Sequence, residues 1–374
     1  MRSQDAEAVR LFLCGDVMLG RGIDQILPHP SDPRLFEEYV HDASAYVAMA
    51  ERRQGAMPRG VGFDYVWGDA LAELEQRTPW LRLVNLETAV TTSDAPWSGK
   101  GIHYRMQPAN LPCLAAAGIN CCALANNHVL DWGYAGLRET LASLHGAGIA
   151  TVGAGEDDEA AARPAVFPLC SGGRLLVFAF GARDSGIPET WTASPGHAGV
   201  NLLPDFTITT VECIARRIDA VRRLGDLVVA SIHWGDNWGY AVAREHRRFA
   251  HALIDHAGVD LLHGHSSHHP RPLEVHRERL ILYGCGDFIN DYEGISGYEV
   301  FRSDLCLAYW PELDPRDGRL LALAMTPLQI RQFRLRRACP TDAEWLATRL
   351  RKASQPFGAE TQLASDGALE MHWR

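Results

Sequence analysis

The sequence predicts a layered α/β domain, in which a sandwich of β-sheets is flanked by helices. Short apolar runs with the length of buried strands alternate with segments whose apolar residues recur at helical spacing. Several of the apolar runs end in Asp, Glu, Asn or His. No internal repeat, low-complexity tract or clear linker divides the chain. We therefore expect a single domain over residues 1–374.

The composition is that of a globular protein with a sizeable core, because 47% of the residues are hydrophobic and 22% are charged. A net charge of −10 argues against a nucleic-acid backbone as the main partner. No apolar run approaches the roughly 18 residues of a membrane-spanning helix, so no membrane partner is expected. The composition does not indicate an oligomeric state.

The cysteines and the N-terminus predict a cytoplasmic protein. Residues 1–10 are polar and lead directly into a strand, so we expect no signal peptide. The nine cysteines form no Cys-x-x-Cys pair, and most of them lie in apolar strands. This distribution is typical of reduced core thiols.

The first strand is expected over residues 9–14, and Gly15-Asp16 follows it directly. An Asp held between glycines after a buried strand suits a metal ligand, although a capping Asp would have the same pattern. Prolines break residues 22–65, where only 37–53 has helical spacing. A long insertion after a first active-site loop suggests a lid or a substrate wall, with surface decoration as the alternative.

The next elements are a helix over residues 65–77 and a strand over 82–86, which ends in Asn85-Leu86-Glu87. The loop that follows contains Lys100, His103 and Arg105 near an aromatic residue, Trp97. Basic and aromatic groups together would suit a carboxylate on a substrate. A solvated loop is the more common explanation for such residues.

A short helix over residues 108–117 leads to an apolar strand over 119–124. After this strand come Asn126-Asn127-His128 and Asp131, and then a helix over 134–145 with leucines at helical spacing. An amide, an imidazole and a carboxylate therefore cluster where a strand gives way to a helix, which is the edge where open α/β sheets bind ligands. An Asn-rich turn with a capping Asp is the alternative.

In the second half of the chain, predicted strands again alternate with predicted helices. Strands are expected over residues 149–155, 175–180, 226–232, 259–262 and 280–283, and helices over 208–224 and 244–256. The strand over 226–232 ends in His233-Trp234, and the strand over 259–262 runs into His265 and His268. Gly286-Asp287 follows the strand over 280–283.

The tail, residues 300–374, is predicted to be a hairpin and a helix. Residues 304–313 and 320–330 flank Asp317-Gly318, which is a hairpin signal. Thr341 and Glu344 have the spacing of a capping box, which predicts a helix that ends near residue 353.

Six polar residues from the strand ends form a candidate metal site. They are Asp16, Glu87, Asn127, His233, His265 and His268. Carboxylate and amide oxygens suit Ca²⁺, Mg²⁺ or Mn²⁺, whereas imidazole suits Zn²⁺, iron or Mn²⁺. Their shared position after consecutive strands makes a divalent cation site more probable than any one of them does.

The order Gly-Asp, Asn-Leu-Glu, Asn-Asn-His-x-x-Asp, His-Trp-Gly and Gly-His-x-x-His over residues 10–290 resembles the CapA family of poly-γ-glutamate capsule synthesis. The resemblance implies a calcineurin-like metallophosphoesterase fold, which is a four-layer α/β/β/α sandwich. It also implies an acid–base role for His128, with Asp131 as its partner. It groups the ligands as Asp16, Glu87 and His268 around one metal position, and Asn127, His233 and His265 around the other.

The chain departs from the phosphoesterase pattern at two positions. Met18 stands where the first motif usually has a His, and Glu87 stands where a bridging Asp is usual. Loss of an imidazole weakens a tight two-metal site and favours a single harder ion, so Ca²⁺ is the preferred cation, with Mg²⁺ or Mn²⁺ as alternatives.

The chain is also similar to CapA-like proteins that epimerise the C-terminal residue of a lasso-peptide precursor, so a peptide is the expected substrate. This similarity implies two His/Asp pairs that move a Cα proton: His128 with Asp131, and His265 or His268 with Asp16. Three tryptophans, Trp132, Trp234 and Trp238, could hold an aromatic side chain, although buried core is their commoner environment. The alternatives are a binuclear metallohydrolase and a non-catalytic protein of polymer biosynthesis.

Overall fold

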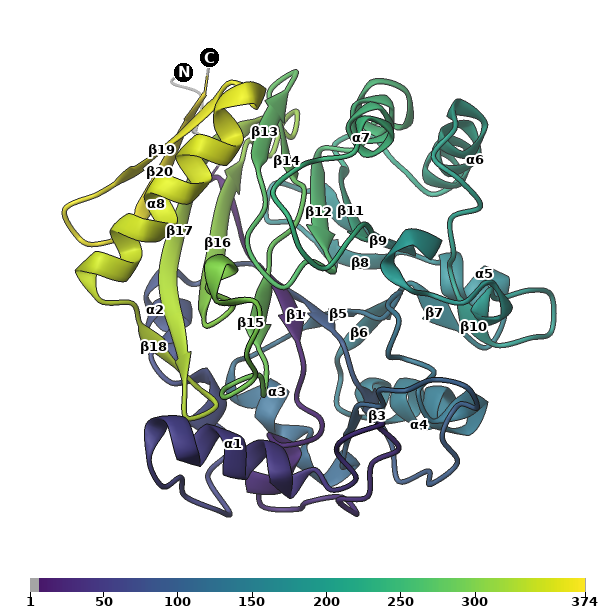
Figure 1. The fold of residues 1–374 in the computed structure, drawn as a ribbon. Coiled ribbons are helices and arrows are strands. Elements are labelled where there is room, and N and C mark those ends of the chain that lie inside the picture. The colour runs from purple at the N-terminus through teal and green to yellow at the C-terminus, as the bar shows by residue number, and fades with distance from the viewer. Residues whose placement is uncertain (1–6, 374) are drawn as a thin grey trace.

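Two mixed β-sheets form the centre of the molecule (Figure 1). The computed structural model describes residues 7–373; residues 1–6, on which the expectation of no signal peptide partly rests, lie outside that range. The larger sheet has the strand order β19 (Ala359–Leu363), β20 (Leu369–Trp373), β17 (Leu320–Arg331), β16 (Leu305–Leu313), β1 (Val9–Val17), β2 (Leu81–Leu86), β5 (Cys121–Ala123) and β6 (Ala150–Val152). In addition, β15 (Asp287–Ile289) pairs with β1, and β18 (Arg334–Arg337) pairs with β17.

The second sheet has six strands. Their order is β13 (Leu273–His276), β14 (Arg279–Leu282), β12 (Leu261–His265), β11 (Leu227–His233), β9 (Arg174–Gly181) and β8 (Ala165–Pro168). Two small ladders lie outside the sheets: β10 (Gly199–Val200) with β7 (Ala154–Gly155), and β3 (Ala89–Val90) with β4 (Arg105–Met106).

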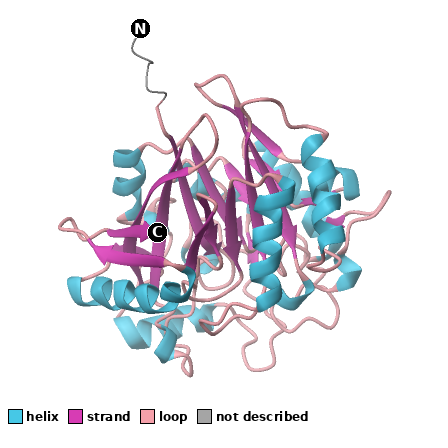
Figure 2. Cartoon of the chain, turned by 90° about the horizontal axis from the view of Figure 1, so that it is seen from above, coloured by secondary structure: helices cyan, strands magenta, loops and turns pink. Residues whose placement is uncertain are grey.

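Helices surround the two sheets, most of them on the outer faces, as the view from above shows (Figure 2). They are α1 (Ser44–Gln54), α2 (Ala70–Arg77), α3 (Pro112–Ala116), α4 (Gly133–Gly146), α5 (Asp158–Ala162), α6 (Ile208–Asp219), α7 (Arg244–Ala257) and α8 (Pro340–Ser354).

The alternation of side chains along β11 shows how the layers are held together. Leu227 and Val229 belong to a core that also contains Leu11 of β1, so they fill the space between the sheets. Val228 and Ile232 point to the other face, where they join a second core with residues of α6 and α7. A strand that is buried on both faces has a nearly continuous apolar sequence, as residues 227–232 do, where Ser231 is the one polar residue. The α/β/β/α sandwich implied by the resemblance is therefore present.

Several element boundaries differ from the sequence predictions. The helix predicted over residues 65–77 is broken into a 3₁₀ turn, Tyr65–Trp67, and α2, because Gly68 has a φ of 46°. The strand predicted over 149–155 is divided at Gly153, which has a φ of 90°. The capping box is wrong: α8 starts at Pro340, and the side chain of its N-cap residue, Cys339, makes no capping hydrogen bond.

The cysteines only partly match the expectation of core thiols. All nine are free, and six are buried, whereas Cys170, Cys213 and Cys339 are exposed. Within residues 7–373, no helix is both long enough and apolar enough to span a bilayer.

The insertion over residues 22–65 is anchored to the sheets by one buried arginine. The guanidinium of Arg21 forms ion pairs with Asp291 (2.6 Å), which follows β15, and with Glu37 (2.9 Å), which belongs to the insertion. It also lies over the rings of Tyr46 of α1 and Tyr104, at 3.9 and 4.5 Å. The insertion therefore packs next to the edge where β1 and β15 end.

Replacing this arginine should be costly. Arg21→Met would leave Asp291 and Glu37 buried without their counter-charge, and we expect a loss of about 3–5 kcal/mol in the free energy of unfolding. Arg138→Met is the matched control, because Arg138 pairs with Glu156 at 2.9 Å on the surface and such a pair contributes at most about 1 kcal/mol. Urea unfolding measures both. Equal losses for the two variants would contradict the anchoring role.

Candidate metal centre

Two carboxylates meet at the carboxyl ends of β1 and β2. Asn85 lies between them and donates through Nδ2 to Oδ1 of Asp16 (2.7 Å) and Oε2 of Glu87 (3.0 Å). All three side chains are buried, and Oδ2 of Asp16 has no hydrogen-bond partner within the described residues. Close approach of the chain after β14 requires glycine before Asp16, because a Cβ on Gly15 would lie 1.6 Å from the carbonyl oxygen of Gly286.

The charges of these carboxylates are poorly compensated by the protein. Burial, with a further contribution from nearby Asp287, raises the pKa of Asp16 to about 7. Burial and the proximity of Asp16 also raise the pKa of Glu87. Carboxylates in such a position favour a bound cation, and the unpartnered oxygen of Asp16 is available to it. The residues present therefore fit a divalent metal ion.

Two histidines reach this point from the second sheet. Parallel pairing of β11 with β12 places His233 opposite His265, with their Nδ1 atoms 2.9 Å apart. Ligand atoms of Asp16, His233 and His265 all lie within 4.8 Å of one another. Burial lowers the pKa of both rings, so each is neutral near pH 7 and can offer a lone pair to a metal. Ser231 Oγ lies 2.9 Å from Nε2 of His265 and helps to orient that ring.

A second group of ligand atoms also contains Asp16. Atoms of Asp16, His268 and Asp287 lie within 4.8 Å of one another. Nδ1 of His268 is 2.9 Å from Oδ1 of Asp287, whose other oxygen accepts from Asn290 (2.8 Å). Burial lowers the pKa of His268, but the carboxylate of Asp287 outweighs it and raises that pKa overall. Asp16 is thus common to two potential cation positions.

The six residues proposed from sequence lie together, but in a different grouping. Asp16 lies with His233 and His265 as well as with His268, and Asn127 Oδ1 is 3.1 Å from Nε2 of His233. Glu87 joins the cluster through Asn85.

Sequence reasoning missed two residues of the cluster. Asp287 and Asn85 were not proposed as part of the site, although Gly286-Asp287 repeats the Gly15-Asp16 pattern after another strand. That repeated Gly-Asp pair was the available signal. Asn85 sits in the motif that supplied Glu87, one position before the strand ends.

A histidine–carboxylate pair lies beside the carboxylates. Nδ1 of His128 is 2.7 Å from Oδ2 of Asp131, and the ammonium of Lys100 contacts the other oxygen of Asp131. Oδ2 of Asp131 also accepts from the backbone N–H of Tyr104 (2.6 Å). The other ring nitrogen of His128, Nε2, faces Glu87 at 3.8 Å from Oε1. Asp131 therefore fixes the imidazole with Nε2 directed at the cluster.

The charge state of the pair follows from its environment. Burial and, to a smaller extent, the nearby charge of Lys100 outweigh the opposing effect of Asp131 and lower the pKa of His128 to about 4. The pKa of Asp131 is also lowered: burial opposes this, but His128 and Lys100 outweigh it. At pH 7 the pair is therefore a neutral imidazole next to an ionised carboxylate, which suits a proton acceptor.

The comparisons with known proteins agree with this arrangement. Residues 10–292 match the family model described as bacterial capsule synthesis protein PGA_cap. The chain belongs to this PGA_cap (CapA) family. It is 48% identical over 366 residues to a probable polyglutamine synthesis accessory protein of Mycobacterium tuberculosis, covering 98% of this chain and 96% of the relative.

More distant relatives point to the same family. The chain is 24% identical to the capsule biosynthesis protein CapA of Bacillus anthracis, over 89% of this chain and 70% of that protein. It is also 24% identical to the PGA biosynthesis protein CapA of Bacillus subtilis, over 74% of this chain and 62% of that protein.

The second acid–base pair of this PGA_cap chain differs from the one expected. His265 Nδ1 is 3.8 Å from Oδ1 of Asp16, which is beyond hydrogen-bond distance. His268 has Asp287 as its carboxylate partner, not Asp16. The expectation was wrong because it left out Asp287, which β15 brings alongside β1.

Most side chains proposed to bind substrate in the PGA_cap chain are engaged elsewhere. Arg105 donates to the backbone oxygens of Ser93 and Asp32 and lies over the buried ring of Trp132 (4.0 Å). His103 is buried beside the carbonyl of Trp97 (3.2 Å).

Two further residues proposed to bind substrate, Trp234 and Lys100, also contact other side chains of the protein. Trp234 stacks on His246 within the second core, at 4.7 Å between centroids, and Lys100 is held by Asp131. Of the six, only Trp238 lines the large cavity beside the centre. Trp132, Trp234, His103 and Arg105 are buried, as most tryptophans and paired arginines are.

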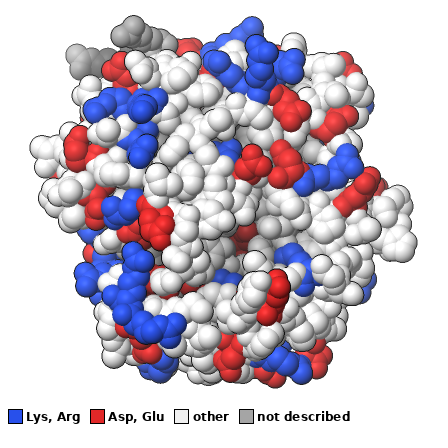
Figure 3. Space-filling view, viewed as in Figure 1, with Lys and Arg blue, Asp and Glu red and all other residues white. Residues whose placement is uncertain are grey.

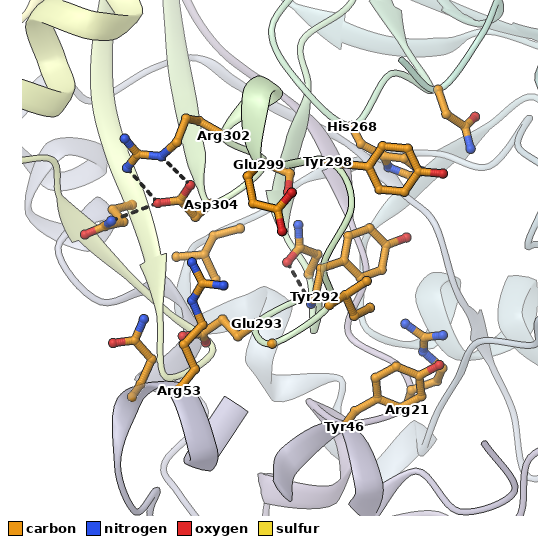
Figure 4. A pocket seen from close by; sticks show the side chains of 18 of the residues that line it. Arg21, Tyr46, Arg53, His268, Tyr292, Glu293, Tyr298, Glu299, Arg302 and Asp304 are labelled. Carbon is orange, nitrogen blue, oxygen red and sulfur yellow. Dashed lines mark hydrogen bonds and ion pairs between the residues drawn. The ribbon is translucent and has the colours of Figure 1, made fainter. Parts of the chain in front are cut away.

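That cavity has a volume of about 480 Å³ and opens next to the second ligand group. His268 and Tyr292 line it (Figure 4), and so do Asn290 and Tyr104. The hydroxyls of Tyr104 and Tyr292 are 3.0 Å apart. The insertion contributes Tyr46, Arg53 and Gln54 to its wall. On the surface, the face that Figure 3 shows is hollowed near its middle. A molecule in the cavity would thus reach the metal ligands from the side of His268.

Proposed function

We propose that the chain is a binuclear metal-dependent hydrolase that cleaves an amide bond during synthesis of a glutamate- or glutamine-based polymer. The observation that carries the proposal is the position of Asp16, which is common to two groups of potential ligand atoms. A shared carboxylate is the arrangement by which two cations are held close together. The names of the relatives support the polymer as the context.

The donor atoms also bear on the choice of cation. One group offers two imidazoles and a carboxylate, and the other offers one imidazole and two carboxylates. Mixed nitrogen and oxygen ligands fit Mn²⁺, Zn²⁺ or iron better than Ca²⁺, which takes oxygen ligands. Bound there, such cations would polarise the carbonyl of the substrate and make water more acidic.

The protein would move the proton. Neutral His128, held by Asp131, is positioned to take a proton from the attacking water through Nε2 and to return it to the leaving nitrogen. The carboxylate of Asp131 stabilises the imidazolium between these two steps.

Metal content and turnover test the proposal together. Protein loaded with Mn²⁺ should bind two ions per chain and should hydrolyse γ-glutamyl peptides or, as a generic substrate, p-nitrophenyl phosphate. Chelation should abolish both activities, and re-addition of the ion should restore them. His145→Gln is a suitable control, since His145 is exposed and belongs to neither group of potential ligand atoms. One bound ion without hydrolysis of either substrate would overturn the proposal.

A second candidate is the epimerisation of a peptide Cα. Two histidine–carboxylate pairs support it: His128 with Asp131 (2.7 Å) and His268 with Asp287 (2.9 Å). One pair would remove the proton and the other would return it from the opposite face. Incubating peptides in D₂O separates the candidates, because epimerisation incorporates deuterium at Cα and hydrolysis does not. Polymer binding with neither reaction would favour a non-catalytic accessory role.

A further inference from the structure

The outer end of the large cavity carries two opposite charges that face each other across it. Arg53 rises from the end of α1, and Glu299 descends from the segment after β15, so the two side chains enter from opposite sides (Figure 4). Within residues 7–373, the guanidinium of Arg53 makes no hydrogen bond or ion pair. Both residues are exposed, and each is available to a ligand in the cavity.

The other charged groups that line the cavity are already paired. Arg21 is held by Asp291 and Glu37. Arg302 is held by Asp304 (2.8 Å) and by Asp342 (3.0 Å) outside the cavity. These ion pairs therefore leave few charged groups in the cavity that could bind a ligand.

Glu293, another acidic residue that lines the cavity, already accepts hydrogen bonds from the protein. Its two oxygens accept from the backbone N–H groups of Gln332 (2.8 Å) and Phe333 (2.6 Å). Among the described residues, no side chain donates to the carboxylate of Glu299, which accepts from the backbone N–H of Gly297 at 3.0 and 3.1 Å. Arg53 and Glu299 are thus the cation and the anion that remain for a ligand.

The two charges sense each other without touching. The positive charge of Arg53 contributes to lowering the pKa of Glu299, behind the backbone hydrogen bonds that lower it most. No ion pair forms between them, so the guanidinium nitrogens of Arg53 and the carboxylate oxygens of Glu299 are more than 4.0 Å apart. A separated pair of opposite charges is complementary to a ligand that carries both charges in the reverse order.

We propose that Arg53 and Glu299 bind the amino-acid head of the substrate, in which an ammonium and a carboxylate are attached to one carbon. The carboxylate would pair with the guanidinium of Arg53, and the ammonium with Glu299. This inference rests on the proposed function and adds to it the end of the substrate that the enzyme recognises. A free amino acid has such a head, and so does the N-terminal residue of a γ-linked chain. An α-linked chain does not, because its first carboxylate is consumed in the peptide bond.

The wall between this end and the metal ligands suits the rest of the chain. Tyr298 stacks on Trp238 at 4.1 Å with an interplanar angle of 4°, and Trp238 lies 5.1 Å from the ring of His268. All three line the same cavity. A flat aromatic wall contacts the methylene groups of a γ-linked backbone without requiring a hydrogen bond. A chain held by its head at Arg53 would therefore extend along Trp238 toward His268.

Calorimetric binding tests the inference without requiring turnover. The ligands are γ-glutamyl-glutamate, its N-acetyl derivative, its α-linked isomer and free glutamate. The γ-linked dipeptide should bind most tightly of the three dipeptides, and Arg53→Gln and Glu299→Gln should each weaken it by roughly 10- to 100-fold. Arg53→Lys should retain part of the affinity. If free glutamate binds as tightly as the γ-linked dipeptide, the head belongs to a free amino acid; weaker binding assigns it to a chain end.

Matched variants and a second substrate keep this result separate from the proposed function. Arg52→Gln and Glu38→Gln remove exposed charges that do not line the cavity, and both should leave binding unchanged. Hydrolysis of p-nitrophenyl phosphate by the unaltered protein and by Arg52→Gln tests the proposed function on its own, because that substrate lacks the head. Equal effects of Arg53→Gln and Arg52→Gln, or equal affinity for the N-acetyl dipeptide, would overturn the inference even if the enzyme is a hydrolase.

Discussion

Asp16→Asn should stabilise the metal-free protein at pH 8 and, at the same time, remove most of the stabilisation that a divalent cation gives to the unaltered chain. The carboxylate of Asp16 is buried next to Glu87 and Asp287, so its negative charge opposes folding unless a cation is bound. The variant amide can still accept from Asn85 through its oxygen, and its NH₂ group can donate to Glu87. It cannot bridge two cations.

The pH dependence of this effect has a definite sign. The pKa of Asp16 is about 7 in the folded protein and 3.8 in the unfolded chain. The folded state therefore holds more protons than the unfolded state between these values. This contribution to stability is fully present below about pH 4 and is lost as the pH rises through 7. Its size is on the order of 4 kcal/mol.

Thermal unfolding with a chelator and with Mn²⁺, from pH 5 to pH 8, measures both effects. The unaltered protein should lose stability with rising pH in the chelator and regain it with Mn²⁺, whereas Asp16→Asn should show a weaker pH slope and little response to Mn²⁺. Asp219→Asn is the control, since Asp219 is exposed at the end of α6. A variant that is less stable without metal but keeps the full Mn²⁺ response would contradict the role of Asp16 as the shared ligand.

The sequence predicted the layers because burial leaves a clear pattern in them. Strands such as β11 are buried on both faces and appear as uninterrupted apolar runs, and the helices that cover them have one apolar stripe. The breaks at Gly68 and Gly153 were not predicted, since a glycine at positive φ looks like any other glycine in a sequence. The same limit hid the exact start of α8.

The candidate centre could be predicted as a set of residues but not as a geometry. The ligands come from strands of both sheets, and which of them meet depends on how the sheets face each other. Asp287 was left out because β15, with three residues, is too short to show a pattern. Lys100 was interpreted as a substrate-binding residue, whereas the structure places it against Asp131, a contact across 31 positions that no local pattern encodes.

Replacing His128 should reduce turnover by about 10² to 10⁴-fold, the usual contribution of a positioned acid or base, without reducing metal binding. His128 belongs to neither group of potential ligand atoms, and only Glu87 of the carboxylates lies near its Nε2, at 3.8 Å. His128→Gln keeps a polar group of similar size but cannot accept a proton at neutral pH. Asp131→Asn should also lower kcat, because an amide at this position cannot stabilise the imidazolium.

The pH profile distinguishes proton transfer from a purely structural role. A base must be neutral, so turnover should fall as the pH drops through the pKa of His128, which is about 4 in the metal-free protein. The charge of Lys100 helps to keep that pKa low, so Lys100→Gln should raise it and move the acidic limb of the kcat profile to higher pH. An NMR titration of the His128 ring should show the same direction of shift. If kcat falls in His128→Gln together with metal content, or if Lys100→Gln leaves the acidic limb in place, His128 is not the group that moves the proton.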